Sequence, residues 1–363
     1  MKKLVIPIVL AAFVLSMIAA PAFAVQNQAA QEKEPKKQAA RIFIPKEVKD
    51  VLLAGLPARQ PRQDLPFSIF KTTFLPAQSG SFVFFFLKFK NADLGFVPDA
   101  APQVADAAAV VAQPKLKATF DVFLQFHKTE NGVSTSILKE VYVPAVMEED
   151  PAGFNPEKEE WYTIGYPVPA GTFVLALAVT THDLKKIGTQ YVEFALPDPK
   201  AAAKEMDTTP ILFLKEYADA PVAENVTMIH KGFFRWATLK ITPNLDNVFN
   251  VGDVLDLFFY ISGAQPNDQN KFDIDCQYVV NQGDKLAINF ASAKYETPFI
   301  SQPLPLKQTL NIKKETEKGT EERQEIRDLP PGTYTFQVKI KDNVSGKTCT
   351  KSLDFTVKEP APK

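Results

Sequence analysis

The chain is short of the residues on which several classes of protein depend. It has two Cys and three His among 363 residues, too few for a disulfide framework or a four-thiolate zinc site. It contains only 15 Gly, and neither a Gly-x-Gly-x-x-Gly nor a P-loop motif is present to hold nucleotide phosphates. His-Glu-x-x-His and Gly-x-Ser-x-Gly motifs are also missing. We therefore predict a protein that is not an enzyme and that carries no cofactor.

No excess of one charge is present either. The 41 Lys and Arg stand against 42 Asp and Glu, and this balance argues against nucleic-acid binding through a general basic charge. A mixed-charge run at 313–323 indicates a solvated hairpin connection. Hydrophobic residues make up 45% of the chain, so it is not disordered as a whole, and its length allows two cores.

The long apolar run of the chain lies at its start. Lys2 and Lys3 precede an uncharged apolar stretch, and Ala22 and Ala24 place small residues just before Val25. This pattern is typical of a cleavable secretory signal peptide. A membrane anchor is the alternative, but the stretch barely reaches spanning length. We expect an exported protein, periplasmic or secreted, with no stable membrane span after cleavage.

Phenylalanine and proline are plentiful, with 29 of each. After Arg62, short runs rich in Phe and Val are separated by prolines, as in β-sandwiches. Before them, Pro45 opens a helical pattern over 46–54. We predict an all-β protein of two tandem sandwiches. Its expected parts are a signal peptide (1–24), a tether with a short helix (25–62), sandwich 1 (63–199) with an insertion (91–117), a linker (200–210), sandwich 2 (211–358) and a tail (359–363).

An internal repeat favours this duplication. Residues 169–173 correspond to 330–334 at an offset of 161, and the apolar alternation continues without a gap through the following hairpin. Residues 120–122 match 272–274 at an offset of 152. Two matches in the same order indicate a duplicated domain.

The hairpin that begins at Leu329-Pro330-Pro331-Gly332-Thr333-Tyr334 resembles the late hairpin of immunoglobulin-like and fibronectin type III-like domains of exported bacterial proteins. The resemblance implies a Greek-key sandwich in which the Tyr334 hydroxyl folds back to the preceding backbone. It also implies that alternate residues of the strand face the core: Phe336, Val338 and Ile340. Phe173 holds the equivalent place in the first copy and has no hydroxyl. The resemblance implies no activity.

Cys276 and Cys349 are the two thiols, and export permits their oxidation. Their parity places both side chains inward. In the resembled sandwich their strands flank the central late strand, so two strand spacings, about 9–10 Å, separate them. That separation exceeds disulfide reach. A disulfide and a pair of buried thiols remain the alternatives.

The two copies differ on one sheet face. Outward positions of the late strand are polar in the second copy, whereas the first copy has Val174, Ala176 and Ala178 there. On an earlier strand, Phe123 stands where the offset of 152 puts Asp275. Phe123 and the three late-strand residues therefore form a predicted interaction face on sandwich 1.

Something must cover this region, because the run at 81–89 is apolar on both faces. One alternative is a cover from within the chain, supplied by the insertion or by the short helix. The other is a protein partner, whose identity the sequence does not give.

The remaining candidate sites are weaker. Asp273 and Asp275 share one outward strand face near Asp268, an arrangement that would suit a calcium ion, but the loop lacks the order of a dedicated calcium loop. His182 lies at a hairpin tip, where a solvated turn residue is expected.

Four aromatic residues could form a platform for sugars: Trp161, Tyr162, Tyr166 and Trp236. Packing in a core is the favoured alternative. We therefore expect an exported protein that acts by binding or by building an assembly through protein–protein contacts. A carbohydrate-binding module is the second reading.

Overall fold

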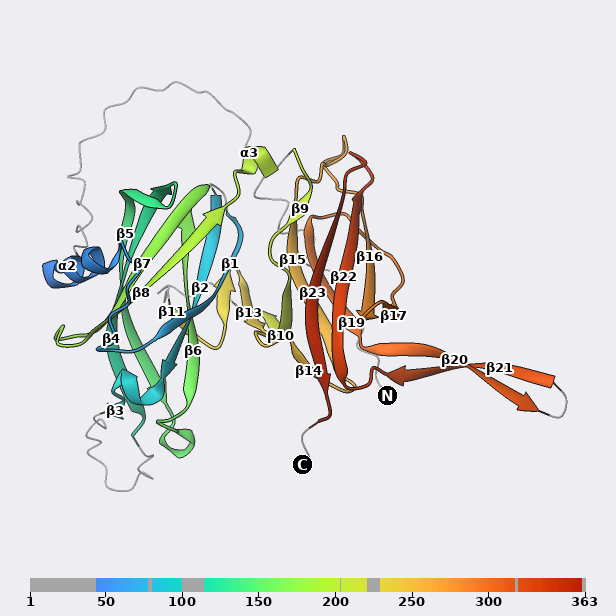
Figure 1. Cartoon of the computed structure of the whole chain (residues 1–363), viewed down its shortest axis with the longest axis horizontal. Coiled ribbons are helices and arrows are strands. Elements are labelled where there is room, and N and C mark those ends of the chain that lie inside the picture. Colours follow the sequence, from blue (N-terminus) through green and yellow to red (C-terminus); the bar gives the residue numbers. More distant parts are fainter. Residues whose placement is uncertain are drawn as a thin grey trace, which may run out of the picture. The chain divides into compact units, whose positions relative to one another are not determined.

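The structure is a computed structural model, and it describes residues 44–77, 80–99, 114–202, 204–220, 229–316 and 319–360. The predicted signal peptide and most of the predicted insertion lie outside the described residues. The described residues contain four short helices: α2 (Lys46–Gly55), η2 (Asn91–Leu94), η3 (Pro151–Gly153) and α3 (Pro199–Ala202). The rest of the ordered elements are strands, which confirms the all-β prediction (Figure 1).

Two sheets form the first half of the described chain. Sheet A contains β3 (Val97–Pro98), β4 (Leu116–Glu130), β5 (Val133–Glu149), β7 (Gly171–Thr181) and β8 (Ile187–Leu196). Sheet B contains β1 (Ser68–Ala77), β2 (Gly80–Lys90), β6 (Glu159–Val168) and β11 (Ile229–Lys231). Neighbouring strands in both sheets are antiparallel.

Two further sheets and a ribbon form the second half. Sheet C contains β9 (Asp207–Thr208), β10 (Leu212–Asp219), β12 (Phe234–Trp236), β13 (Leu239–Pro243), β15 (Val254–Ser262) and β19 (Phe299–Pro305). Sheet D contains β14 (Val248–Asn250), β16 (Ile274–Gln282), β17 (Lys285–Asn289), β18 (Ala293–Tyr295), β22 (Gly332–Asp342) and β23 (Thr348–Lys358). The ribbon, which we call the arm, is β20 (Lys307–Thr316) paired with β21 (Gly319–Asp328).

Strand alternation builds a core inside each pair of sheets. On β4, Phe120, Val122 and Leu124 point into a cluster that sheets A and B share. On β15, Leu255 and Leu257 point into a second cluster, between sheets C and D. Side chains of a strand alternate between its two faces, so each of these runs leaves its intervening residues on the outer face of its sheet.

The repeat seen in the sequence is kept in the strands. β7 and β22 each have 11 residues and begin 161 positions apart. The strand pairing corrects the offset between β4 and β16. Val122 pairs with Val179 and Cys276 pairs with Ile340, and Val179 and Ile340 are themselves 161 positions apart. β4 and β16 are thus related by 154 positions and not by the predicted 152. The change of two residues keeps every side chain on its predicted face.

A third apolar cluster joins the outer faces of sheets B and C. Phe84 and Phe86 of β2 pack with Phe234 of β12 and Phe258 of β15. Strand β11 adds to this link, since it belongs to the later part of the chain but pairs with β6 of sheet B. This explains why residues 81–89 are apolar on both faces: one face fills the core with sheet A, and the other contacts sheet C.

A fourth cluster lies between α2 and the outer face of sheet A. Val48 and Leu52 are fully buried there. The helix agrees with the predicted pattern over 46–54, and none of the described helices is long and apolar enough to cross a membrane.

Close packing also explains Gly188 of β8, where a Cβ would lie 1.8 Å from the Leu65 carbonyl oxygen.

Candidate functional site

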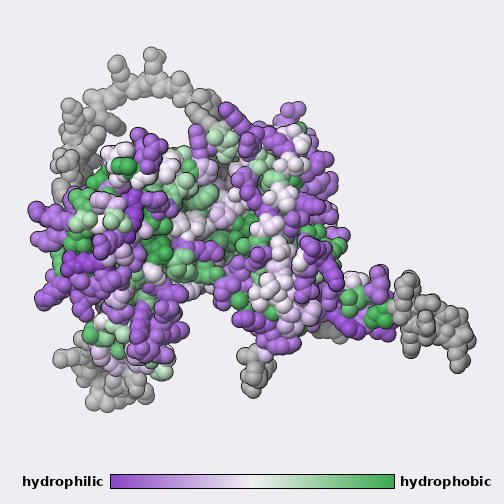
Figure 2. Space-filling view, in the orientation of Figure 1, coloured by the Kyte–Doolittle hydropathy of each residue, from purple (hydrophilic) through white to green (hydrophobic). Residues whose placement is uncertain are grey.

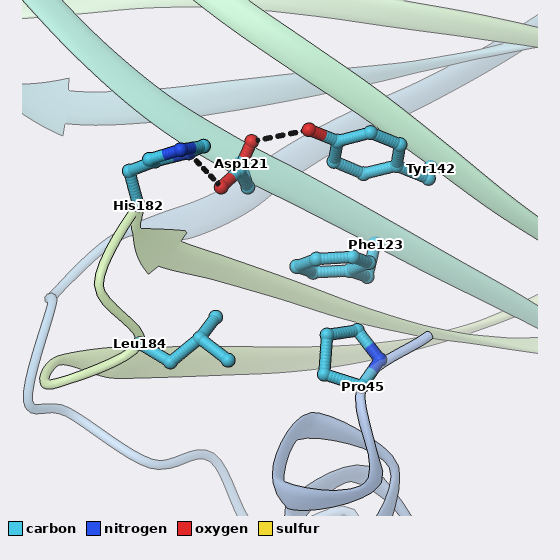
Figure 3. A pocket seen from close by; sticks show the side chains of 6 residues that line it. All are labelled: Pro45, Asp121, Phe123, Tyr142, His182 and Leu184. Atoms are coloured by element: carbon cyan, nitrogen blue, oxygen red, sulfur yellow. Dashed lines mark hydrogen bonds and ion pairs between the residues drawn. The ribbon is translucent and has the colours of Figure 1, made fainter. Parts of the chain in front are cut away.

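The side chains best suited to acid–base chemistry meet at the tip of the β7–β8 hairpin (Figure 3). His182 Nδ1 lies 3.0 Å from Asp121 Oδ2, and the Tyr142 hydroxyl donates to Asp121 Oδ1 at 2.8 Å. Phe123 and Leu184 complete a shallow pocket of about 190 Å³ beside the start of α2. The sequence offered no way to pair Asp121 with His182, because 61 residues separate them.

Burial changes the acidity of this group. Asp121 is only 5% exposed, and the Tyr142 hydroxyl donates a hydrogen bond to its carboxylate. Burial, and then the bond to Asp121, raise the pKa of Tyr142 to about 12. The carboxylate fixes the His182 ring through Nδ1, while the His182 side chain is 78% exposed. The residues lining the pocket include no Ser, Cys or Lys that could act as a nucleophile.

The same contact recurs in the second copy, with different chemistry. The offsets of 154 and 161 make Asp275 the counterpart of Asp121 and Asn343 the counterpart of His182. Asn343 Nδ2 donates to Asp275 Oδ2 at 2.9 Å. An amide cannot replace a histidine in acid–base catalysis, but it can replace it as a hydrogen-bond donor. The pair therefore acts as a clamp that fixes a hairpin tip to the neighbouring strand.

A buried histidine of sheet A, His127, belongs to a polar strip on the same outer face. His127 is 2% exposed; its two ring nitrogens contact Gln125 at 3.3 Å and Ser134 at 3.1 Å. Gln125 donates to Glu140, which also pairs with Lys49 of α2 at 2.9 Å. Burial lowers the pKa of His127, and Arg59 lowers it further. These contacts tie α2 to the sheet.

The three carboxylates predicted as a possible calcium site do not converge on a shared position. Asp273 and Asp275 lie on one face as expected, but both accept hydrogen bonds from the Asn343 amide, at 3.1 and 2.9 Å. A donor therefore occupies the space between the two carboxylates. Asp268 is exposed in the preceding loop. Among the described residues, no group of three or more His, Cys, Asp or Glu side chains is arranged to hold a metal ion.

Cys276 and Cys349 are both free thiols. Each of them faces Ile340 across a ladder, Cys276 from β16 and Cys349 from β23. The central strand β22 therefore separates them, which is the arrangement that the resemblance implied. Burial raises the pKa of Cys276 to about 12 and that of Cys349 to about 11, so neither thiol is activated.

The predicted interaction face is buried. Phe123 is 4% exposed, and Val174, Ala176 and Ala178 are 0% exposed beneath α2. The ladder corrects one correspondence: the counterpart of Phe123 is the exposed Gln277, and not Asp275. The small side chains on β7 leave room for the helix, whereas their polar counterparts on sheet D remain in solvent.

The aromatic residues do not form a platform. Tyr162 is 0% exposed in the core between sheets A and B, and Tyr166 stacks there on Phe126. Trp161 and Trp236 pack in the cluster between sheets B and C. The Trp236 indole stacks on a ring of β19 and donates its N–H to the Pro76 carbonyl at 3.1 Å. Core packing, the favoured alternative, accounts for all four.

The arm is a two-stranded ribbon that forms a sheet of its own. Its ten cross-strand pairs run from Lys307–Asp328 to Thr316–Gly319, and within the described chain neither strand pairs with any other. Ile326 is 70% exposed, and hydrophobic and hydrophilic residues lie side by side on the arm (Figure 2). The sequence identified part of this segment as a hairpin connection but gave no indication of its length.

The sheets, whose strand pairs are antiparallel except for β14 with β23, define an all-β protein. No protein-family model and no curated protein matches the chain. Among solved structures, the fibronectin(III)-like modules of Clostridium thermocellum CbhA match at 10% identity, over 80% of this chain and 95% of that chain, with a TM-score of 0.18. The likeness is distant, and no argument about function rests on it.

Proposed function

We propose that this is an exported, non-catalytic protein that acts by binding a protein partner or building an assembly. The signal-peptide pattern at residues 1–24 supports export to the periplasm or the extracellular space. Two predicted sandwiches form the body, which presents the arm to its surroundings.

The arm is the observation that carries this proposal. A two-stranded ribbon with both faces in solvent is marginally stable by itself, because it has no core. It also presents strand edges whose backbone groups can pair with another chain. Leu310 and Ile312 are only partly buried on one face, and Ile326 is exposed on the other. A bound partner would cover these side chains and complete the hydrogen bonding of a strand edge.

The polar contacts of the described residues support the same proposal. The one Asp–His pair at the hairpin tip recurs as Asp–Asn in the second copy, so its shared property is hydrogen bonding and not proton transfer. The carbohydrate alternative depended on Trp161 and Trp236, whose rings are engaged in the cluster between sheets B and C. No contact in the described chain favours that alternative.

Site-specific photo-crosslinking in the native cell tests the proposal. A photoreactive amino acid at Gln324 of the arm should give one or a few discrete protein adducts in the envelope or extracellular fraction. The matched control is Gln277, an exposed residue on the outer face of sheet D, where adducts should be absent. Retention of the protein in the cytoplasm, or equal adducts from both positions, would contradict the proposal.

A further inference from the structure

The outer edge of β21 has no partner strand in the described chain. β20 lies on its other side over all ten positions. Such an edge offers a row of backbone donors and acceptors to an incoming strand. The side chains of β21 determine which incoming strand can pair with this edge.

The charges on β21 alternate along one face. Arg323, Glu325 and Arg327 are spaced two residues apart, so their side chains share that face. Glu325 Oε1 lies 2.9 Å from Arg327 Nε, and Glu325 Oε2 lies 3.9 Å from Arg323. These two arginines lower the pKa of Glu325, Arg327 having the larger effect, so the carboxylate stays ionised at neutral pH. A row of alternating sign is complementary to its own antiparallel copy.

We propose that β21 pairs with β21 of a second copy of this chain, antiparallel and about a two-fold axis through Gln324. This inference rests on the proposed function and names the partner. Arg323 then faces Glu325 of the second copy, and Glu325 faces Arg323 of the second copy. The two arms together form a four-stranded sheet, a size at which a sheet of this kind becomes stable.

This register is the one that fits the arm. Gln324 lies near the middle of Gly319–Asp328, so pairing about it engages nearly the whole strand and keeps the two bodies at opposite ends. Pairing about Glu325 would place two carboxylates opposite each other, which is unfavourable. β20 lacks an alternating charge row over its described side chains, since Leu310 and Ile312 occupy the equivalent positions.

A cysteine cross-link tests the register directly. In Gln324→Cys the two thiols meet at the axis, where opposed Cα atoms lie about 4.5–5.5 Å apart, within disulfide reach. We expect a disulfide-linked dimer under mild oxidation. Asn311, which faces Gln324 on β20, is the matched control. In Asn311→Cys the thiols belong to strands three spacings apart, about 14–15 Å, and should not cross-link. Cross-linking through Asn311→Cys alone, or through neither variant, would overturn the proposal.

Charge reversal gives a second test by sedimentation equilibrium. Glu325→Arg places like charges opposite each other twice and should weaken the dimer at least about tenfold in Kd. The double variant Arg323→Glu/Glu325→Arg restores opposite charges and should restore the dimer. A double variant as weak as the single one would refute the charge register.

The two proposals fail separately. A monomeric wild-type chain that still gives arm-specific adducts in the cell retains the binding function and loses the second-copy partner. A dimer whose arm crosslinks only to a second copy of the chain supports both proposals, and its adduct has twice the mass of the chain. A monomer without adducts ends both.

Discussion

Tyr334 connects the corner of the late hairpin to its own backbone. Its hydroxyl donates to the Pro330 carbonyl at 2.7 Å, and the side chain is 1% exposed. This bond is the one that the sequence resemblance implied. Phe173 occupies the equivalent position in the first copy, where its ring stacks on Phe194 in the core and has no hydroxyl to donate.

We expect Tyr334→Phe to lower the free energy of unfolding by about 1 kcal/mol, because the part-buried hydrogen bond to the Pro330 carbonyl is lost. Urea denaturation followed by circular dichroism measures the change. Tyr217→Phe is the control, since Tyr217 is 45% exposed and should be close to neutral. Equal effects of the two substitutions would show that the corner bond contributes nothing.

His230 of β11 makes the fold sensitive to acid. Burial, and then Arg235, lower the pKa of its ring to about 4, and the ring stacks on Phe233 at 4.8 Å. A histidine with a lowered folded-state pKa contributes its full stability above pH 6.5. That contribution is lost as the pH falls from 6.5 to 4.

The free energy of unfolding should therefore fall by about 1–3 kcal/mol between pH 6.5 and 4 from this residue. His230→Phe should reduce that fall, although His127, whose pKa burial also lowers, should retain part of it. Phe70→Leu, at a half-exposed ring that does not titrate, is the control and should leave the pH profile unchanged. A His230→Phe profile that superimposes on the wild type would exclude the effect.

Among the elements, α2 has the clearest role. It covers a sheet face whose small residues on β7 leave space for it, and Val48 and Leu52 are its buried contacts. The periodicity of the sequence predicted the helix to within one residue. The sequence left open whether the helix, the insertion or a partner covers the face, because periodicity shows which side of an element is apolar and not what lies against it.

Val48→Asp should destabilise the protein by about 3 kcal/mol and increase binding of a dye specific for apolar surface, because a buried carboxylate has no partner there. Leu53→Asp, five residues further along α2 on its exposed side, should do neither, since Leu53 is 42% exposed. Dye binding that rises equally in both variants would mean that α2 does not cover the face.

The cluster between sheets B and C links the two halves of the described chain. Phe84 and Phe234 lie with ring centroids 4.4 Å apart, and β11, which precedes β12 of sheet C in the chain, pairs with β6 of sheet B. Burial of aromatic rings couples the unfolding of the sheets that bury them, so we expect the wild type to unfold in a single transition.

Phe234→Ala should remove about 3–5 kcal/mol of packing from this cluster and split the calorimetric transition into two. Phe70→Ala, at a ring that is 40% exposed on β1, should leave a single transition. Two transitions in the wild type, or one in Phe234→Ala, would show that the cluster does not couple the sheets.

Local alternation and turn residues predicted the strands, the short helix and the duplicated hairpin, and the resemblance of that hairpin implied the Tyr334 corner, because all of these involve residues close together in the chain. The contact of Asp121 with His182, the packing of sheet C on Phe84 and Phe86, and the extension of the arm from the sheets became visible only in the folded chain. These contacts join residues far apart in the chain, and the apolar or polar character of a side chain does not specify which distant surface will meet it.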